Sequence, residues 1–454
     1  MRQTQEGGSL SNLKTKLETI RSVGPLSASC CIYRVPPSLR KVNEEDYTPN
    51  LVSIGPFHHG NRKLEPTQHL KLWYLHKFLE RTQESKSFDD FAKFLQSSED
   101  KIRRCYSETI QMESDKFISM ILTDAGFIIE LFLARSDDLS SSDDLPSGDD
   151  LPSGDDLPSG DDLPSSDDLL VNKPWPRADL LQDLVLIENQ LPLFILEDLY
   201  HQTFPTGFNG MLSFLDLAIP IFVGHFSGNI YYTTYDKIFD KSSIPYQVEH
   251  LCDILRAFCL PTNPPPRIRL RASKRSHSAS QLHDSGVKLQ VHEGKKLTEV
   301  LFSDGSLRIP SMRVSNIIEK LLRNVVAFEQ CHYPSKHYVT DYIVLLDFLI
   351  QSGKDVEILV EKGIMESFLD GDAVASMFTS LRKNLIETSA NSGYVSLHAE
   401  LDEFCNKPYH KHKAIFVRDY WSTPWKKASS TAAVLLLFLT FIQTICSIIP
   451  LFKK

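Results

Sequence analysis

The 454-residue sequence lacks the motifs by which the commoner enzymes bind phosphate, activate a nucleophile or hold zinc. It contains no G-x-x-x-x-G-K-[ST] loop, no G-x-G-x-x-G fingerprint and no H-E-x-x-H pair. Gly224 to Gly228 reads GHFSG, which places the serine one position too late for a nucleophile elbow. The eight cysteines form no C-x-x-C pair, so neither a zinc ribbon nor a secreted disulfide scaffold is indicated. We therefore expect no catalytic motif of a familiar class, no cofactor and no bound metal.

Basic charge is also scarce, because 49 Lys and Arg stand against 58 Asp and Glu. Twelve of the acids lie between Asp137 and Asp168, which leaves 46 acidic against 49 basic residues elsewhere. Nucleic-acid binding needs a clear basic surplus, so we expect no nucleic-acid partner.

Met1 to Ile20 has no apolar run typical of a secretory signal, and no N-x-[ST] glycosylation site occurs. Both absences indicate that the bulk of the chain faces the cytosol.

The longest uncharged apolar run extends from Ala428 to Phe452, with a lysine pair on each side. As a helix, its 25 residues reach roughly 37 Å, more than the hydrocarbon thickness of about 30 Å. Because only two residues follow the run, we expect a single-pass tail anchor at the plasma membrane or the endoplasmic reticulum. The open alternative is a soluble scaffold in which this helix is buried. The predicted membrane-embedded residues are Val434, Leu435, Leu436, Leu437, Phe438, Leu439, Phe441, Ile442, Ile445, Ile448 and Ile449.

Four polar residues within this run follow helical spacing and form one stripe: Thr440, Gln443, Thr444 and Ser447. In lipid, a polar stripe prefers another helix to acyl chains. We therefore predict a contact between transmembrane helices, either with a second copy of the chain or with a different protein.

Acidic hexads of the type DDLPSG repeat over residues 137–170. Their single leucine, frequent proline and paired aspartates offer almost nothing to bury, so we predict a disordered insertion. Outside it, apolar residues recur at helical spacing over Lys63–Arg81, Phe88–Leu133 and Leu180–Leu199, and in several segments after Asn316. Val287–Ile309 alone is typical of strands, with a turn at Asp304-Gly305.

These patterns predict a mainly α fold: a large helical domain with a small β insertion, plus one C-terminal transmembrane helix. The predicted organisation is a flexible N-terminus over residues 1–28, the helical domain over 29–425 and the anchor over 426–454.

Three carboxylates interrupt apolar runs that we expect to be buried: Asp124, Glu130 and Glu188. A buried acid with a raised pKa can serve as a general acid or base, so an unfamiliar enzyme is the rival hypothesis. We favour a structural role for Glu188, Asn189 and Gln190, which can satisfy backbone groups near Pro192. Four clustered histidines are likewise expected to be hydrogen-bonded and not zinc ligands: His58, His59, His69 and His76.

Several segments together resemble the large plant family called domain of unknown function 247. They include CCIYRVPPSLRKVNEEDYTPNLVSIGPFHHG at Cys30–Gly60, DLVLIENQLPLFILEDL at Asp183–Leu199 and LLRNVVAFEQC at Leu321–Cys331. The order and spread of these segments cover nearly the whole chain outside the hexads. The chain departs from the family at Asp124-Ala125-Gly126-Phe127, where the family usually has Asp-Gly-Cys-Phe.

The resemblance implies a flowering-plant protein with a C-terminal membrane helix and no established enzymatic activity. Some relatives are implicated in grass self-incompatibility, which implies recognition of partner proteins near a membrane. We therefore expect a membrane-anchored interaction protein and not an enzyme, with membrane lipid and an unidentified protein as partners and a homo-oligomer as a further expectation.

Overall fold

The computed structural model describes residues 27–82, 86–141, 174–208, 210–223, 225–226, 247–262, 277–293, 296–386, 394–407 and 424–448. Within these ranges the chain is mainly helical with a few short strands, which confirms the prediction of a mainly α fold with a small β part. By internal contacts, the described residues of 1–262, 312–340 and 380–386 form one compact unit. Those of 263–311, 341–379 and 387–454 form the second unit. The predicted hexad insertion and flexible N-terminus lie almost entirely outside the described residues, and the predicted domain boundaries stay predictions.

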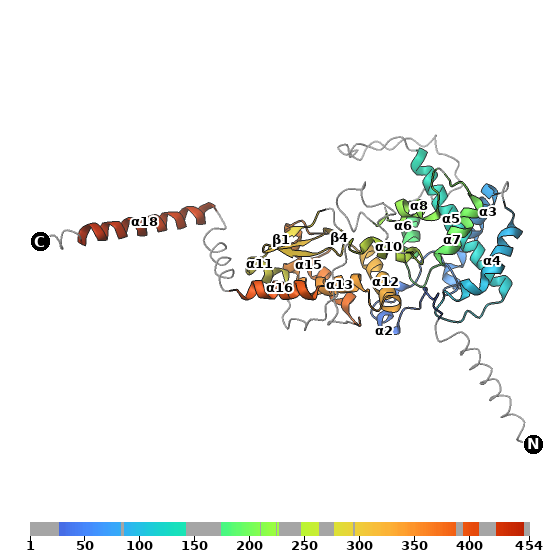
Figure 1. Cartoon of the computed structure of the whole chain (residues 1–454), viewed down its shortest axis with the longest axis horizontal. Coiled ribbons are helices and arrows are strands. Elements are labelled where there is room, and N and C mark those ends of the chain that lie inside the picture. The colour runs from blue at the N-terminus through green and yellow to red at the C-terminus, as the bar shows by residue number, and fades with distance from the viewer. Residues whose placement is uncertain are drawn as a thin grey trace, which may run out of the picture. The chain divides into compact units, whose positions relative to one another are not determined.

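The first unit is built around one long apolar helix, α5 (Ser114–Ser141). Helices α3 (Gln68–Thr82), α4 (Phe88–Arg103) and α7 (Leu193–Thr203) all pack on it (Figure 1). A helix that is apolar on every side must be covered on every side, and 83% of the apolar window of α5 is buried. The remaining elements of this unit are α2 (Pro37–Arg40), η1 (Glu45–Tyr47), η2 (Arg62–Thr67), α6 (Pro174–Asp183), α8 (Phe214–Ala218), η3 (Ile219–Val223), α10 (Leu251–Cys259), β4 (Met312–Val314) and α12 (Asn316–His332).

Aromatic rings fill the spaces between these helices. The ring of Tyr74 on α3 meets Phe127 of α5 edge-to-face, with 5.3 Å between centroids. Phe132, further along α5, contacts Phe214 of α8 in the same way at 5.6 Å. Such edge-to-face pairs add about 0.5–1.5 kcal/mol to the gain from burial, so they hold α5 in one position.

Local sequence sets where the helices begin. Ser87 caps α4 through a reciprocal pair of bonds, in which its hydroxyl accepts from the Asp90 amide and the Asp90 carboxylate accepts from the Ser87 amide. The predicted helical run Leu180–Leu199 is two helices, since α6 ends at Asp183 and α7 begins at Leu193. Pro192 immediately precedes α7 with φ −58° and ψ 131°, which are extended and not helical angles, so it marks a junction between two helices.

The second unit combines helices with a three-stranded sheet in the order β1-β3-β2. Strand β1 (Lys288–Val291) pairs with β3 (Ser306–Ile309) in parallel, and β2 (Leu301–Ser303) pairs with β3 in antiparallel orientation. The predicted turn joins β2 to β3, with φ of 50° at Asp304 and 72° at Gly305. Two positive φ values are what a tight two-residue hairpin requires, and Asp-Gly adopts them readily.

Helix α11 (Ala279–Asp284) packs near β1, and α16 (Val395–Asn406) packs near β2. The other elements of this unit are α14 (Gly353–Glu361), β5 (Met365–Ser367) and α18 (Pro424–Ile448). The division between the units falls within α13 (Tyr338–Leu349) and α15 (Gly371–Arg382). The strands that the sequence predicts near 287–291 and 306–309 are thus confirmed, while β4 and β5 carry too few residues to leave a periodic signal.

The same kind of substitution should change the free energy of unfolding by different amounts in the two apolar helices. Phe127→Ala in α5 removes a fully buried ring and should lower the free energy of unfolding by about 3–5 kcal/mol. Phe438→Ala in α18 removes a ring that is 61% exposed and should change it by less than about 0.5 kcal/mol. Urea denaturation of the detergent-solubilised protein, followed by circular dichroism, measures both. Equal losses would show that α18 is packed in the core.

Candidate functional site: buried carboxylates and an exposed apolar helix

The turn between α6 and α7 sends its polar side chains into the N-terminal segment of the same unit. Asp183, at the end of α6, accepts from the amides of Asn50, Leu51 and Val52 at 2.6–3.1 Å. Asn189 accepts from the Ile54 amide at 2.7 Å and donates to the carbonyl of Val52 at 2.9 Å. Buried backbone amides need hydrogen-bond partners. In this segment side chains supply them, because the residues are not paired in a sheet.

Gln190 acts within the turn itself. Its amide nitrogen donates to the carbonyls of Leu184 and Leu186, at 2.6 and 2.8 Å. The backbone carbonyl oxygen of Gln190 accepts from the hydroxyl of Tyr106 at 3.1 Å. The side chain therefore closes the turn, and the backbone links the turn to the residues that follow α4.

Glu188 is the most heavily contacted carboxylate of this turn. It is 1% exposed, and its Oε1 accepts from the Val35 amide at 2.7 Å and lies 2.6 Å from Arg40 Nη2. Its Oε2 lies 3.1 Å from Arg34 Nη1 and 3.2 Å from His58 Nε2. The Arg34 guanidinium also stacks on Phe57, 4.3 Å from the ring centroid. One buried charge thus holds both ends of the segment from Arg34 to His58.

The pKa of Glu188 reflects these contacts. Burial raises it, but the hydrogen bonds from His58, the Val35 amide and Arg40 outweigh burial and lower the pKa to about 2. A carboxylate with so low a pKa stays ionised at neutral pH, so it cannot donate a proton as a general acid.

Asp124 and Glu130 have separate partners on α3. Asp124 lies 2.5 Å from Lys71 Nζ and accepts from the Gly55 amide at 2.8 Å, while Lys71 also donates to the carbonyl of Ser53. Burial raises the pKa of Asp124, and the Lys71 charge opposes that rise. Glu130 accepts from Arg81 Nε at 2.9 Å with both oxygens. The two acids pair α5 with α3, and their partners are not those of Glu188.

The four histidines that the sequence singles out, all of them in the described part of the chain, do not come together as a metal site. His58 contacts Glu188, whereas His76 lies 3.1 Å from Glu80 on the exposed surface of α3. Among the residues that the structure describes, no group of three or more His, Cys, Asp or Glu side chains is arranged to hold a metal ion.

Sequence reasoning missed three partners of these acids, Arg34, Arg40 and Lys71, and it also missed the buried acid Asp183. Lys71 carried a usable signal, because it lies between apolar residues in the predicted helix. In the structure this residue is 1% exposed. Asp183 gave none, because an acid at the end of a helix looks like a surface residue.

The apolar helix α18 contrasts with α5. Residues 428–445 have a mean hydropathy of 1.8, similar to the 1.9 of α5, yet none of that window is buried. The hydroxyls of Thr440 and Thr444 donate to the carbonyls of Leu436 and Thr440, each at 2.8 Å. The side chains of Ser447 and Ile448, and the whole of Ile449, lie outside the described residues.

A model of a plant protein family of unknown function, DUF247, matches residues 32–439. The chain belongs to this family. The match begins just before the segment that Glu188 holds and ends within α18, so it includes that segment and the first part of α18.

Two proteins from Arabidopsis thaliana are similar to this chain. One UPF0481 protein is 27% identical over 453 residues, which cover 93% of this chain and 87% of that protein. A putative UPF0481 protein is 22% identical over 505 residues, which cover 91% of this chain and 89% of that protein. No solved structure matches this DUF247 chain.

In this DUF247 protein, we expect Glu188→Gln to lower the free energy of unfolding by about 3 kcal/mol at pH 7. The variant leaves Arg34 and Arg40 near a neutral group in a buried site. Glu108→Gln, at an acid that is 54% exposed and also contacts Arg34, is the control and should cost less than about 1 kcal/mol.

The difference between Glu188→Gln and the wild type should depend on pH. The folded pKa of about 2 lies below the ordinary value of 4.5, so the stabilisation is complete above pH 4.5 and is lost as pH falls toward 2. Denaturation at a series of pH values measures this. A difference that stays constant over that range would contradict the assignment.

Proposed function

We propose that this DUF247 protein is a single-pass, tail-anchored membrane protein whose helical body binds another protein at the cytosolic face. The observation that carries the proposal is the exposure of α18. Its apolar side chains, such as Leu437 at 71% and Val434 at 64%, would lie in water without a membrane or partner. A contiguous apolar surface of this length marks a membrane or protein contact.

The charges beside α18 support a cytosolic body. Five basic residues precede the apolar run within about 20 positions, and two follow it. Cytosolic flanks carry the excess of Lys and Arg, so the body would stay in the cytosol and the C-terminal end would cross. The preceding residues are Lys411, Lys413, Arg418, Lys426 and Lys427, and the following ones are Lys453 and Lys454.

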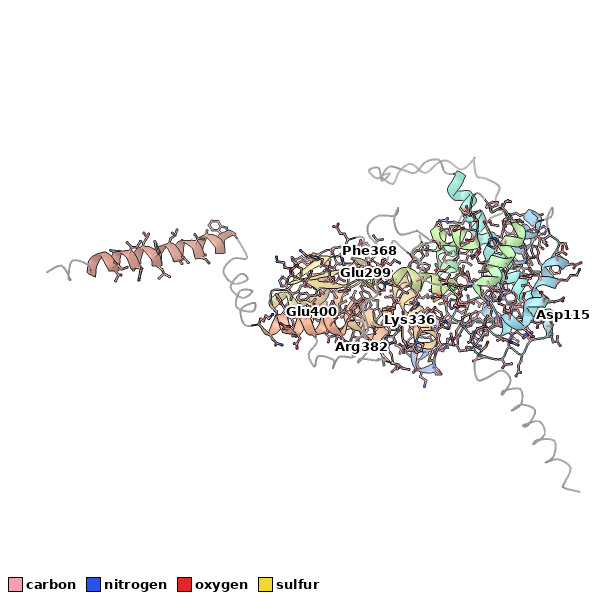
Figure 2. The ribbon with its side chains drawn as sticks, in the orientation of Figure 1. Asp115, Glu299, Lys336, Phe368, Arg382 and Glu400 are labelled. Carbon is pink, nitrogen blue, oxygen red and sulfur yellow. The ribbon has the colours of Figure 1, made fainter. Side chains whose placement is uncertain are left out.

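The contacts of the three candidate acids support a binding role more than a catalytic one. Asp124, Glu130 and Glu188 each contact a cation, and none shares its partners with another. Phe368, labelled in Figure 2 on the loop between β5 and α15, is 88% exposed. Aromatic side chains are frequent anchors of protein interfaces, which suits the recognition role that the family resemblance implies.

A glycosylation tag tests the anchor and its direction together. The natural sequence has no N-x-[ST] site, so one acceptor added after Lys454 gives an unambiguous gel shift. In microsomes we expect this tag to be glycosylated, an N-terminal tag to stay unmodified, and the chain to resist carbonate extraction.

Leu436→Arg with Leu439→Arg should abolish insertion, because each arginine costs about 2.5–3.5 kcal/mol near the centre of a span. Leu436→Ile with Leu439→Ile is the matched control and should insert normally. Extraction of the wild-type chain by carbonate would refute the anchor. Unfolding of the body on removal of residues 424–454 would instead favour a helix buried in the core.

We also propose that the polar stripe of α18 pairs two copies of the chain. Replacing Thr440, Gln443, Thr444 and Ser447 by leucine should reduce crosslinked dimers in vesicles at least about threefold, given about 1–2 kcal/mol for polar contacts between model helices. Replacing Leu435, Leu437, Phe438 and Phe441 by isoleucine is the control for the other residues of the helix. Unchanged dimer levels in the leucine variant would remove the stripe from the proposal.

A further inference from the structure

Cys31 and Cys105 occupy neighbouring positions on two backbone segments of the first unit that run in parallel. Ile32 and Tyr106 form a parallel bridge, and each cysteine immediately precedes one of these residues. The amides of Cys31 and Ile32 both donate to the carbonyl of Cys105 at 2.9 Å. Adjacent strands lie about 4.8 Å apart, within the Cα separation of about 4.4–6.8 Å that a disulfide needs.

The two thiols are buried together and share hydrogen bonds. Cys31 is 2% and Cys105 4% exposed, and both are free cysteines. The thiol of Cys31 contacts the Cys105 sulfur and the Glu249 carboxylate, while Cys105 Sγ lies 3.3 Å from the carbonyl oxygen of Lys101. The hydrogen bond from Cys31 lowers the pKa of Cys105, with burial opposing and the Lys101 charge assisting. The same contact raises the pKa of Cys31.

We propose that Cys31 and Cys105 are a redox modification site, where a small hydroperoxide converts the two thiols into a reversible disulfide. The bond joins the residues just before the segment that Glu188 holds to the connection between α4 and α5. No other described pair of cysteines is assigned this role.

The chemistry balances with hydrogen peroxide as the oxidant. The Cys105 thiolate attacks one peroxide oxygen, the O–O bond breaks, and a sulfenic acid and hydroxide form. Cys31 then attacks the sulfenic sulfur, the S–O bond breaks and hydroxide leaves, while Glu249 accepts the Cys31 thiol proton. In sum, two thiols and one peroxide give one disulfide and two waters. A dithiol reductant reverses the reaction by exchange and is itself oxidised to a disulfide.

Burial selects the oxidant, because hydrogen peroxide is small and glutathione disulfide is not. The oxidised chain should therefore form with peroxide and not with glutathione disulfide. A disulfide that closes a loop of more than 70 residues constrains the unfolded chain, so oxidation should raise the melting temperature by about 5 °C or more.

The test treats the full-length protein in detergent with hydrogen peroxide, blocks remaining thiols with N-ethylmaleimide and digests with trypsin. We expect SVGPLSASCCIYR linked to CYSETIQMESDK, with fragmentation placing the bond on Cys31 and not on Cys30. Linked peptide should disappear in Cys31→Ser and Cys105→Ser and persist in Cys252→Ser, a control at an equally buried thiol.

Glu249→Gln should slow linkage by about tenfold without preventing it, a readout that a purely structural role would not give. The wild-type measurement decides the proposal even if a serine variant fails to fold. Absence of linked peptide at peroxide doses that oxidise the methionines would overturn it. Linkage through Cys30, or linkage only after denaturation, would overturn it equally.

Discussion

The fold of the first unit depends on buried side chains that satisfy the backbone of a segment with little regular structure. From Arg34 to His58 the chain forms only short helical turns, so most of its amides find no partner within a helix or sheet. Asp183, Glu188 and Asn189 provide partners for five of these amides, those of Val35, Asn50, Leu51, Val52 and Ile54. A buried amide left without one costs about 1–3 kcal/mol, so three side chains on one turn fix the course of some twenty residues.

The same polar side chains explain what the sequence could and could not reveal. Charges and amides inside an apolar run identified Glu188, Asn189 and Gln190 as unusual, because burial demands a partner for each. Arg34 lies 154 positions from Glu188 and Ile54 lies 135 positions from Asn189, so these partners are beyond the reach of any periodicity. The helices and the Asp-Gly hairpin were predictable because their determinants are local. The partition into two units was not, since it depends on contacts between distant segments.

Helices α5 and α18 have nearly equal hydropathy, and the residues that interrupt them account for the difference in their surroundings. Asp124 and Glu130 lie within α5 and need cations, which Lys71 and Arg81 of α3 supply. The apolar run of α18 has no charged residue, so nothing in it requires a protein partner in the same way. Hydropathy alone would treat the two helices alike, whereas paired charges distinguish a core helix from a helix suited to lipid.

The long sequence separation between Val35 and Glu188 has a consequence for synthesis on the ribosome. Their hydrogen bond joins residues 153 positions apart, so at about 5–20 residues per second the amide waits about 8–30 s for its acceptor. During that interval the emerging N-terminal segment has no native site to occupy. A nascent chain of this protein is therefore most open to chaperones before the turn after α6 has left the exit tunnel.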